Sequence, residues 1–239
     1  MKRLKKTKII ATLGPSTSSI ETIESLIKEG VDVLRINFSH STHKEAEFLI
    51  KSIRKINDSL SKNIAILADL QGPKLRIGDV VDDTNLNFGE KITIKTDKSF
   101  KGNKSKLFLN YQNLAKDINI GEKILIDDGK IILKVIDTDV KHEVTAEVLQ
   151  GGELSSNKGF NLPNTNISQP ALTDKDIDDA IFSAKHNVDW IALSFVRNGS
   201  DIKSLVKLLE NNTSHRIPII AKIEKPEGVK NIDEICLLY

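Results

Sequence analysis

Apolar residues in the first third of the chain follow two alternating spacings. Short β-branched runs at 7–14, 31–39 and 63–72 predict strands, whereas 18–30 and 42–58 carry apolar residues at helical spacing. Gly30 is the expected stop signal of the first helix. Strands joined by helices imply right-handed parallel crossovers, and the pattern therefore predicts an α/β sheet or barrel.

The middle of the chain has a different pattern. From about 79 to 161, short alternating runs are separated by turn signals, including "DDG" at 127–129 between two apolar runs. Glycine supplies the positive φ that a tight hairpin turn needs. We therefore predict a small all-β domain inserted into the α/β domain.

The helix and strand alternation then resumes. Helices are predicted at 174–186 and 199–212, strands at 188–196 and 217–224, and a fifth helix from residue 226 onward. Acidic residues in the first turn of the helix at 174–186 stabilise the start of that helix, because negative charge interacts favourably with a helix amino terminus.

These changes of pattern predict the domain organisation. The α/β domain occupies 1–78, the inserted β domain 79–161, and the α/β domain continues over 162–239.

Composition excludes several classes of protein. The 239 residues carry a net charge of only +2, so no global field points to nucleic acid or to an anionic membrane. The basic start "MKRLKKTK" lacks interleaved aromatic residues and is interpreted as a solvated end. The single cysteine, Cys236, rules out an internal disulfide, and no 18-residue apolar stretch is present, which makes the cytoplasm the expected location.

Polar residues collect at the carboxyl ends of three predicted strands. Residues two apart share one face of a strand. The polar residues placed in this way are Arg35, Asn37, Ser39, Asp69, Lys222 and Glu224. Any one of them has a simpler explanation as a structural ion pair, but loops at this edge of parallel α/β folds build the site, so their convergence predicts one.

The chemistry of these residues is consistent with phosphoryl transfer. Arg35, Arg76 and Lys222 offer fixed positive charge for a phosphate or carboxylate. Glu224 and Asp69 can bind a hard cation, and Mg²⁺ commonly uses one or two carboxylates together with substrate phosphates. Cations then neutralise charge on the transferring group.

Long motifs along the chain resemble the amino-terminal half of pyruvate kinase over about residues 7 to 235. The motifs occur in the order "TKIIATLGPS", "GVDVLRINFSH", "ADLQGPKLRIG", "IDDGKI", "NKGFNLP", "LTDKDIDDA", "LSFVR" and "IIAKIEKPEGVKNIDEI". The resemblance implies a (β/α)8 TIM barrel with an inserted small β-barrel domain, of which about five of the eight strands are present here.

The resemblance also implies transfer of the phosphoryl group of phosphoenolpyruvate to ADP, giving pyruvate and ATP, with Mg²⁺ or Mn²⁺ as cofactor and a homotetramer for the intact family. Lys222 would stabilise the transferring group and the enolate, Arg35 would contact the substrate phosphate, and Glu224 would ligate Mg²⁺. Residues around the monovalent-cation position would be Asn37, Ser39, Asp69 and the Leu70 carbonyl, and those facing the nucleotide phosphates would be Arg76 and Lys158.

The first departure from the family pattern concerns potassium. Potassium-dependent members resemble "DTKGPE", whereas this chain has "DLQGPK" and so places Lys74 where they carry Glu. An ammonium group near the cation pocket could replace the charge of the ion, and we therefore predict that K⁺ is not required.

The second departure concerns length. A barrel of this type takes about 250 residues, and only five barrel strands are visible here besides the inserted domain. Strands six to eight and the "ARGDLG"-like motif with the second Mg²⁺ carboxylate are missing. The chain is therefore expected to be a truncated product, a gene fragment or part of a longer enzyme, with negligible activity alone.

Two other functions remain open. One is a Mg²⁺-dependent barrel lyase acting on oxaloacetate-like acids, although such an enzyme does not predict the inserted β domain. The other is a non-enzymatic fragment that binds a phosphorylated ligand or associates with an intact homologue.

Several further residues are expected to have no functional role. His40 and His43 are expected to be solvated or to begin a helix, Trp190 to lie in the core, and Lys225 to be a surface charge. Cys236 has no sequence-visible base nearby.

Overall fold

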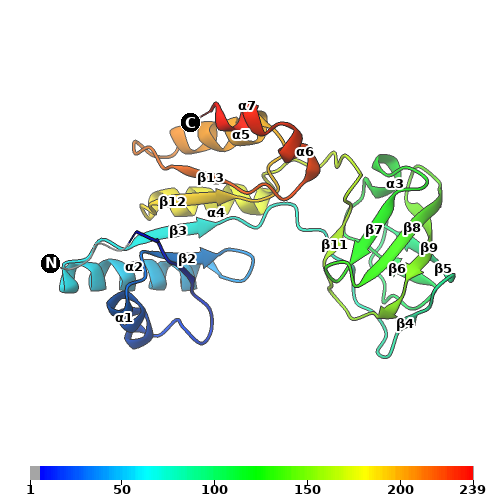
Figure 1. Cartoon of the computed structure of the whole chain (residues 1–239), viewed down its shortest axis with the longest axis horizontal. Coiled ribbons are helices and arrows are strands. Elements are labelled where there is room, and N and C mark those ends of the chain that lie inside the picture. Colours follow the sequence, from blue (N-terminus) through cyan, green and yellow to red (C-terminus); the bar gives the residue numbers. More distant parts are fainter. Residues whose placement is uncertain (1–5, 239) are drawn as a thin grey trace. The chain divides into compact units, whose positions relative to one another are not determined.

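The computed structural model describes residues 6–238, so the first five residues of the basic start and Tyr239 lie outside the described residues. The chain folds into two compact units (Figure 1). The first unit comprises the residues up to Pro73 together with those from Pro170 on, and the second is Lys74–Gln169.

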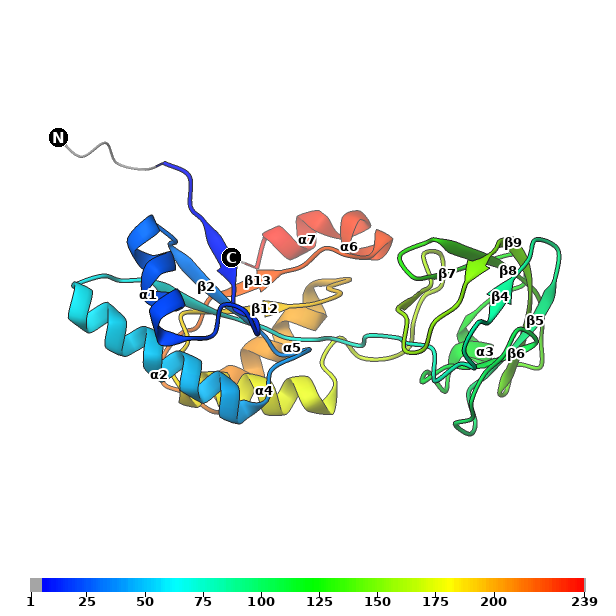
Figure 2. The same ribbon diagram turned by 90° about the horizontal axis from the view of Figure 1, so that it is seen from below.

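The first unit is built on a parallel five-stranded sheet in the order β1-β2-β3-β12-β13. Its strands are β1 (Ile10–Thr12), β2 (Val33–Asn37), β3 (Ala65–Asp69), β12 (Trp190–Leu193) and β13 (Ile219–Ala221). The sheet is curled, with the helices outside it (Figures 1 and 2). The predicted partial barrel is therefore confirmed.

Helices follow the strands of the first unit. They are α1 (Ile20–Glu29), α2 (His43–Leu60), α4 (Asp174–Lys185), α5 (Gly199–Glu210), α6 (Pro226–Lys230) and α7 (Ile232–Cys236). The single helix expected from residue 226 is thus two short helices. One core joins the helices to the helix-facing side of the sheet, where the buried strand residues include Leu34, Ile36, Ile66, Ala68, Ile191 and Leu193.

Capping residues written in the sequence set the helix ends. Thr42 and Glu45 form a capping box at the start of α2, and Thr173 and Asp176 form one at the start of α4. Gly30 ends α1 in the left-handed conformation with φ 103°, as predicted for a helix stop. These local signals fix where each helix begins or ends behind its strand.

The second unit is a β domain with one short helix. Its elements are β4 (Asn85–Leu86), β5 (Lys91–Lys95), β6 (Lys106–Phe108), α3 (Leu114–Asp117), β7 (Lys123–Ile126), β8 (Ile131–Thr138), β9 (Glu143–Gln150), β10 (Gly152–Glu153) and β11 (Phe160–Asn161). Six strands form a sheet in the order β11-β7-β8-β9-β5-β6. The predicted "DDG" hairpin joins β7 to β8, and Gly129 has φ 87°. This unit has its own buried core.

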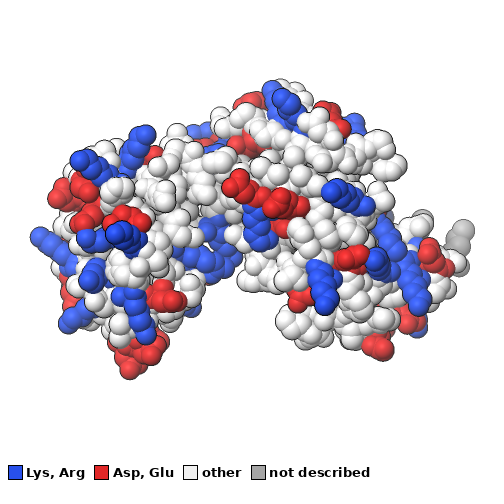
Figure 3. All heavy atoms as spheres, turned by 180° about the vertical axis from the view of Figure 1, so that it is seen from behind, with Lys and Arg blue, Asp and Glu red and all other residues white. Residues whose placement is uncertain are grey.

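Surface charges are mixed in sign. On the face shown in Figure 3, Lys and Arg side chains are interspersed with Asp and Glu. Among residues 6–238, no helix combines the length and the apolar composition needed to cross a membrane.

Candidate functional site

Strand register brings the predicted polar residues of the first unit together. Asn37 on β2 pairs with Asp69 on β3, and Asp69 pairs in turn with Ala192 on β12. Lys222 directly follows β13 and Glu224 lies two residues beyond it. Because the strands are parallel, all these residues lie at the carboxyl edge of the sheet, as predicted.

Asp69 is the centre of this cluster. Its side chain is only 3% exposed, and it bonds to both neighbouring cations. The Arg35 Nε donates to Oδ2 at 2.7 Å, and the Lys222 Nζ donates to Oδ1 at 2.9 Å. A buried carboxylate is costly unless it is paired, so the two cations and Asp69 stabilise one another's positions.

The cationic groups retain access to solvent. The side chains of Arg35 and Lys222 are 29% and 28% exposed, in contrast to Asp69. Because Asp69 is buried and the two cationic groups reach solvent, positive charge is presented at the surface of this edge, where Glu224 is the second carboxylate. Such an edge is suited to an anionic ligand such as a phosphate or carboxylate.

Glu224 lies beside Lys222 on this edge. Its Oε2 accepts a hydrogen bond from the Phe195 backbone N–H at 3.0 Å, and its Oε1 is 3.6 Å from the Lys222 Nζ. The side chain is 38% exposed. Of the described site residues, Glu224 is therefore the carboxylate that a ligand or ion can reach most easily.

The expected monovalent-cation groups also lie at this edge. Asn37 Oδ1 accepts a hydrogen bond from the Ser39 backbone N–H at 3.0 Å. The Leu70 N–H donates to the Ala192 carbonyl at 3.0 Å, while the Leu70 carbonyl accepts a hydrogen bond from the Ser194 hydroxyl at 2.6 Å. Asn37 and Ser39 are thus bonded to each other, and Leu70 is joined to Asp69 through Ser194 and Lys222.

The remaining predicted residues belong to the second unit. Arg76 and Gly159 form an isolated β-bridge, and the Arg76 Nη1 donates to the Asn157 carbonyl at 2.7 Å. The Lys158 Nζ lies 3.1 Å from Asp127 Oδ1. Arg76 and Lys158 therefore lie on neighbouring segments of this unit, which are also joined by a hydrogen bond from the Ile77 N–H to the Lys158 carbonyl at 3.1 Å, and Lys74 stands at the start of the unit.

Two residues of the cluster were not predicted. Thr12 pairs with Arg35 in the β1–β2 register, and its Oγ1 accepts a hydrogen bond from the Arg35 Nη1 at 2.8 Å. Ser194 bonds to Lys222 at 2.8 Å. Both are small polar residues at the carboxyl end of a strand, which is the signal that could have identified them.

Two expectations about the fourth and fifth strands are wrong. Trp190 is 39% exposed rather than buried, and it pairs with Leu67, which is not part of the core shared with the helices. Lys225 is only 8% exposed rather than a surface charge. It stands immediately before α6, and burial lowers the pKa of its ammonium group.

The burial of Lys225 predicts a pH-dependent stability. The folded state releases this proton below the ordinary pKa of 10.5, so the unfolded chain binds more protons between the lowered pKa and 10.5. The free energy of unfolding should therefore rise with pH across that window. In Lys225→Met this rise should be absent, and the free energy of unfolding at pH 7, measured by urea titration, should be higher than in the wild type. The control is Lys230→Met, which changes an exposed residue of α6. Its free energy of unfolding should depend on pH as that of the wild type does. The same dependence in Lys225→Met would contradict the prediction.

The histidines follow the expectation in part. His40 is exposed, as expected, and His43 is the first residue of α2. The His43 ring also has a carboxylate partner, since its Nε2 lies 2.7 Å from Asp179 Oδ1, and it stacks on Phe182. Residues 6–238 contain no group of three or more His, Cys, Asp or Glu side chains that could hold a metal by themselves.

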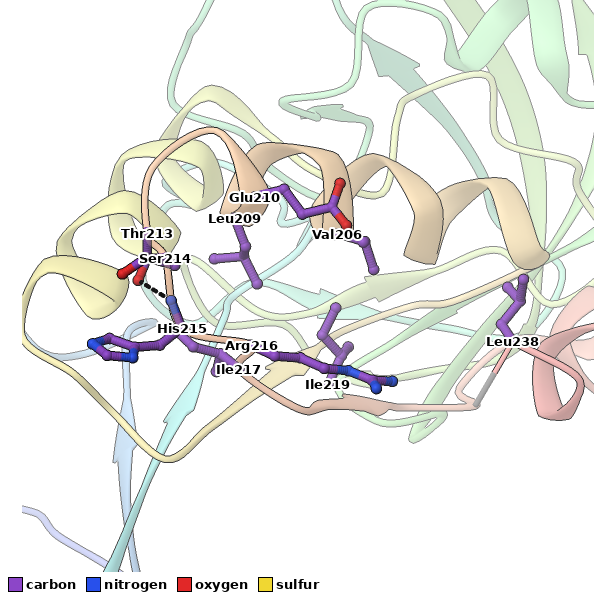
Figure 4. A pocket seen from close by; sticks show the side chains of 10 residues that line it. All are labelled: Val206, Leu209, Glu210, Thr213, Ser214, His215, Arg216, Ile217, Ile219 and Leu238. Atoms are coloured by element: carbon purple, nitrogen blue, oxygen red, sulfur yellow. Dashed lines mark hydrogen bonds between the residues drawn. The ribbon is translucent and has the colours of Figure 1, made fainter.

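A cavity lined by both apolar and polar residues lies at the other end of β13. Its volume is about 460 Å³, and Val206 and Leu209 of α5 face Ile217 and Ile219 across it (Figure 4). The loop that precedes β13 forms one of its walls. None of the predicted site residues lines it, and the site is therefore an exposed edge rather than this cavity.

Comparison with known proteins identifies the family. The sequence model for "Pyruvate kinase, barrel domain" matches residues 4–238. The chain is 42% identical to the pyruvate kinase of Staphylococcus haemolyticus, over 97% of this chain and 40% of that protein. It is also 42% identical to the pyruvate kinase of Corynebacterium efficiens, over 98% of this chain and 49% of that protein.

The fold and these matches agree. A parallel α/β half-barrel interrupted by a β domain, with cationic residues at its carboxyl edge, is a barrel enzyme architecture. The chain belongs to the pyruvate kinase family, as the sequence motifs indicated. It spans less than half the length of these curated relatives.

Proposed function

We propose that the chain provides part of a phosphoryl-transfer site that acts between phosphoenolpyruvate and ADP. The observation that carries this proposal is the convergence of Arg35 and Lys222 on the buried Asp69, with Glu224 beside them. Phosphoryl transfer needs positioned positive charge at the transferring group and little covalent chemistry from the protein.

The side chains have separate roles in this proposal. Arg35 binds the substrate phosphate through its guanidinium group, whose planar array of donors suits a phosphate. Lys222 stabilises the charge on the transferring phosphoryl group and on the enolate of the product. Asp69 does not touch the substrate; it holds both cations in place through its two oxygens.

The divalent ion would be held by Glu224. Mg²⁺ or Mn²⁺ accepts a site with one protein carboxylate when substrate phosphates supply further oxygens, and Glu224 is exposed enough to serve. When bound, the ion would neutralise charge on the substrate oxygens. Asp69 fits this role less well because both of its oxygens are bonded to cations.

The second unit would contribute to nucleotide binding. Arg76 and Lys158 are the residues that we propose to contact the phosphates of ADP or ATP. Their placement on neighbouring segments supports this proposal, since it gives two cations on one part of that unit. We further propose that Lys74 makes K⁺ unnecessary, because its ammonium group would supply the positive charge of the ion.

Binding of phosphoenolpyruvate by the 239-residue chain tests the proposal. We expect saturable heat in a calorimetric titration with Mn²⁺ present, and the same affinity when Na⁺ replaces K⁺. No binding under either condition would refute the phosphoryl-transfer site, and binding only with K⁺ would refute the role of Lys74.

Turnover distinguishes the proposal from its alternatives. In a lactate-dehydrogenase-coupled assay we expect the chain alone to be far slower than the relative from S. haemolyticus, because Glu224 is the only exposed site carboxylate among the described residues. Binding without turnover would fit a fragment that only binds a phosphorylated ligand. Pyruvate release from oxaloacetate, without phosphoenolpyruvate or ADP, would favour a lyase. Normal turnover would refute the expected inactivity.

A further inference from the structure

Ser194 lies next to Lys222 at the carboxyl edge of the sheet. Leu193, the last residue of β12, pairs with Ala221, the last residue of β13, so Ser194 and Lys222 are the next residues on the two strands. Ser194 is 2% exposed, whereas the Lys222 side chain is 28% exposed. A buried hydroxyl therefore lies beneath a partly exposed ammonium group.

The direction of the two hydrogen bonds of Ser194 is fixed by chemistry. The Leu70 carbonyl oxygen, 2.6 Å from the Ser194 Oγ, can only accept, so the hydroxyl hydrogen points to it. The Lys222 ammonium, 2.8 Å from the same oxygen, can only donate. The hydroxyl has one hydrogen, and its remaining lone pairs consequently face Lys222.

The backbone around Ser194 has little freedom to move. A Cβ placed on Gly72 would lie 2.8 Å from the Ser194 Cβ, so only a glycine permits this close approach. The Gly72 N–H donates to Asp176 Oδ1 at 2.9 Å, and Asp176 is buried and caps α4. On the other side, Phe195 has φ 57° and donates its N–H to Glu224.

We propose that Ser194 is a positioning residue for Lys222. Its buried hydroxyl oxygen accepts a hydrogen bond from the Lys222 ammonium group, and the Asp69 carboxylate on β3 accepts another. The two acceptors together fix the position of the ammonium group. Ser194 also joins Lys222 to the Leu70 carbonyl, one of the groups expected around the monovalent-cation position. The catalytic meaning of this arrangement rests on the proposed function, but the hydrogen bonds do not.

Chemical labelling of Lys222 tests the positioning directly. An ammonium group must leave its acceptors before it can react as a free amine, so loss of one acceptor should speed its acetylation. In Ser194→Ala we expect Lys222 to be acetylated about tenfold faster, the size expected for one hydrogen bond to a charged group. The rate would be measured by mass spectrometry of proteolytic peptides, relative to Lys203 on α5 in the same sample.

Two further variants separate this role from packing. Ser194→Cys keeps the approximate volume but supplies only a weak acceptor, and should therefore also label faster. Ser183→Ala is the matched control, because Ser183 is a buried hydroxyl that donates to the Asp179 carbonyl at 2.7 Å. It should leave the Lys222 rate unchanged. An unchanged rate in both Ser194 variants, or unfolding of both, would overturn the positioning role.

Ligand binding provides the readout that depends on the proposed function. Ser194→Ala should weaken phosphoenolpyruvate binding about fivefold without changing the unfolding midpoint by more than Ser183→Ala does. Faster labelling with no phosphoenolpyruvate binding even in the wild type would uphold the positioning role and refute the proposed function. Slower or unchanged labelling with weaker binding would refute the positioning role alone.

Discussion

Replacing Asp69 with alanine is expected to lower the free energy of unfolding of the first unit by about 3 kcal/mol. Removing one partner of a buried ion pair costs about 3–5 kcal/mol, because the remaining charge is left unpaired. The value lies at the low end here because Arg35 and Lys222 keep 29% and 28% of their side chains in solvent. Urea unfolding followed by the fluorescence of Trp190 measures this change.

Trp190 makes the measurement specific. It is the only tryptophan of the chain and belongs to β12 of the first unit, so its signal reports on the unit that contains Asp69. Asp58→Ala is the control, since Asp58 is an exposed carboxylate on α2. A loss for Asp69→Ala no larger than that of Asp58→Ala would show that the cluster does not depend on this carboxylate.

Arg35→Met is expected to weaken phosphoenolpyruvate binding about 100-fold while leaving the fold intact. The substitution removes the guanidinium group proposed to bind the phosphate, and two charge-assisted hydrogen bonds to a phosphate together give an effect of this order. Asp69 keeps its bond to Lys222, so the buried carboxylate retains one cationic partner. Calorimetric titration with Mn²⁺ present gives the affinity.

A second arginine of the same unit supplies the control for this prediction. Arg54 on α2 pairs with Asp189 at 3.0 Å, immediately before β12 begins and therefore at the opposite edge of the sheet. Arg54→Met makes the same change of charge and should leave the affinity unchanged. Equal losses in Arg35→Met and Arg54→Met would mean that only the net charge of the unit attracts the ligand. In that case Arg35 would have no specific role in phosphate binding.

The positions of the candidate residues near the strand ends were predictable, whereas the partners of their side chains were not. Alternation along the predicted strands puts Arg35, Asn37 and Ser39 on one face of their strand, and Lys222 and Glu224 on one face of theirs. It does not show that Asp69 bonds to both Arg35 and Lys222, because this depends on the register between strands that are distant in sequence. The position of Ser194 at a strand end could have been noted from the sequence, but its hydrogen bond to Lys222 depends on the same kind of register.

Burial was also hard to read from local sequence. Lys225 follows a strand and precedes a proline, which suggests a surface loop, yet it is buried where α6 begins. Trp190 is a large aromatic residue at the start of its strand and is nevertheless partly exposed. The helices cover only one face of the curled sheet, and a pattern of hydrophobic residues does not tell which face a given helix covers.

The sequence by itself determined the order of strands and helices in the α/β part, the presence of a β domain and the family, because helix caps, turn glycines and long motifs act over a few residues. The tertiary structure alone decided which charges meet. Asp69, Lys222 and Ser194 come from three different strands, and only parallel pairing in one register brings their polar atoms within hydrogen-bonding distance. Hydrogen bonds require positions accurate to a few tenths of an ångström, which local sequence patterns cannot specify.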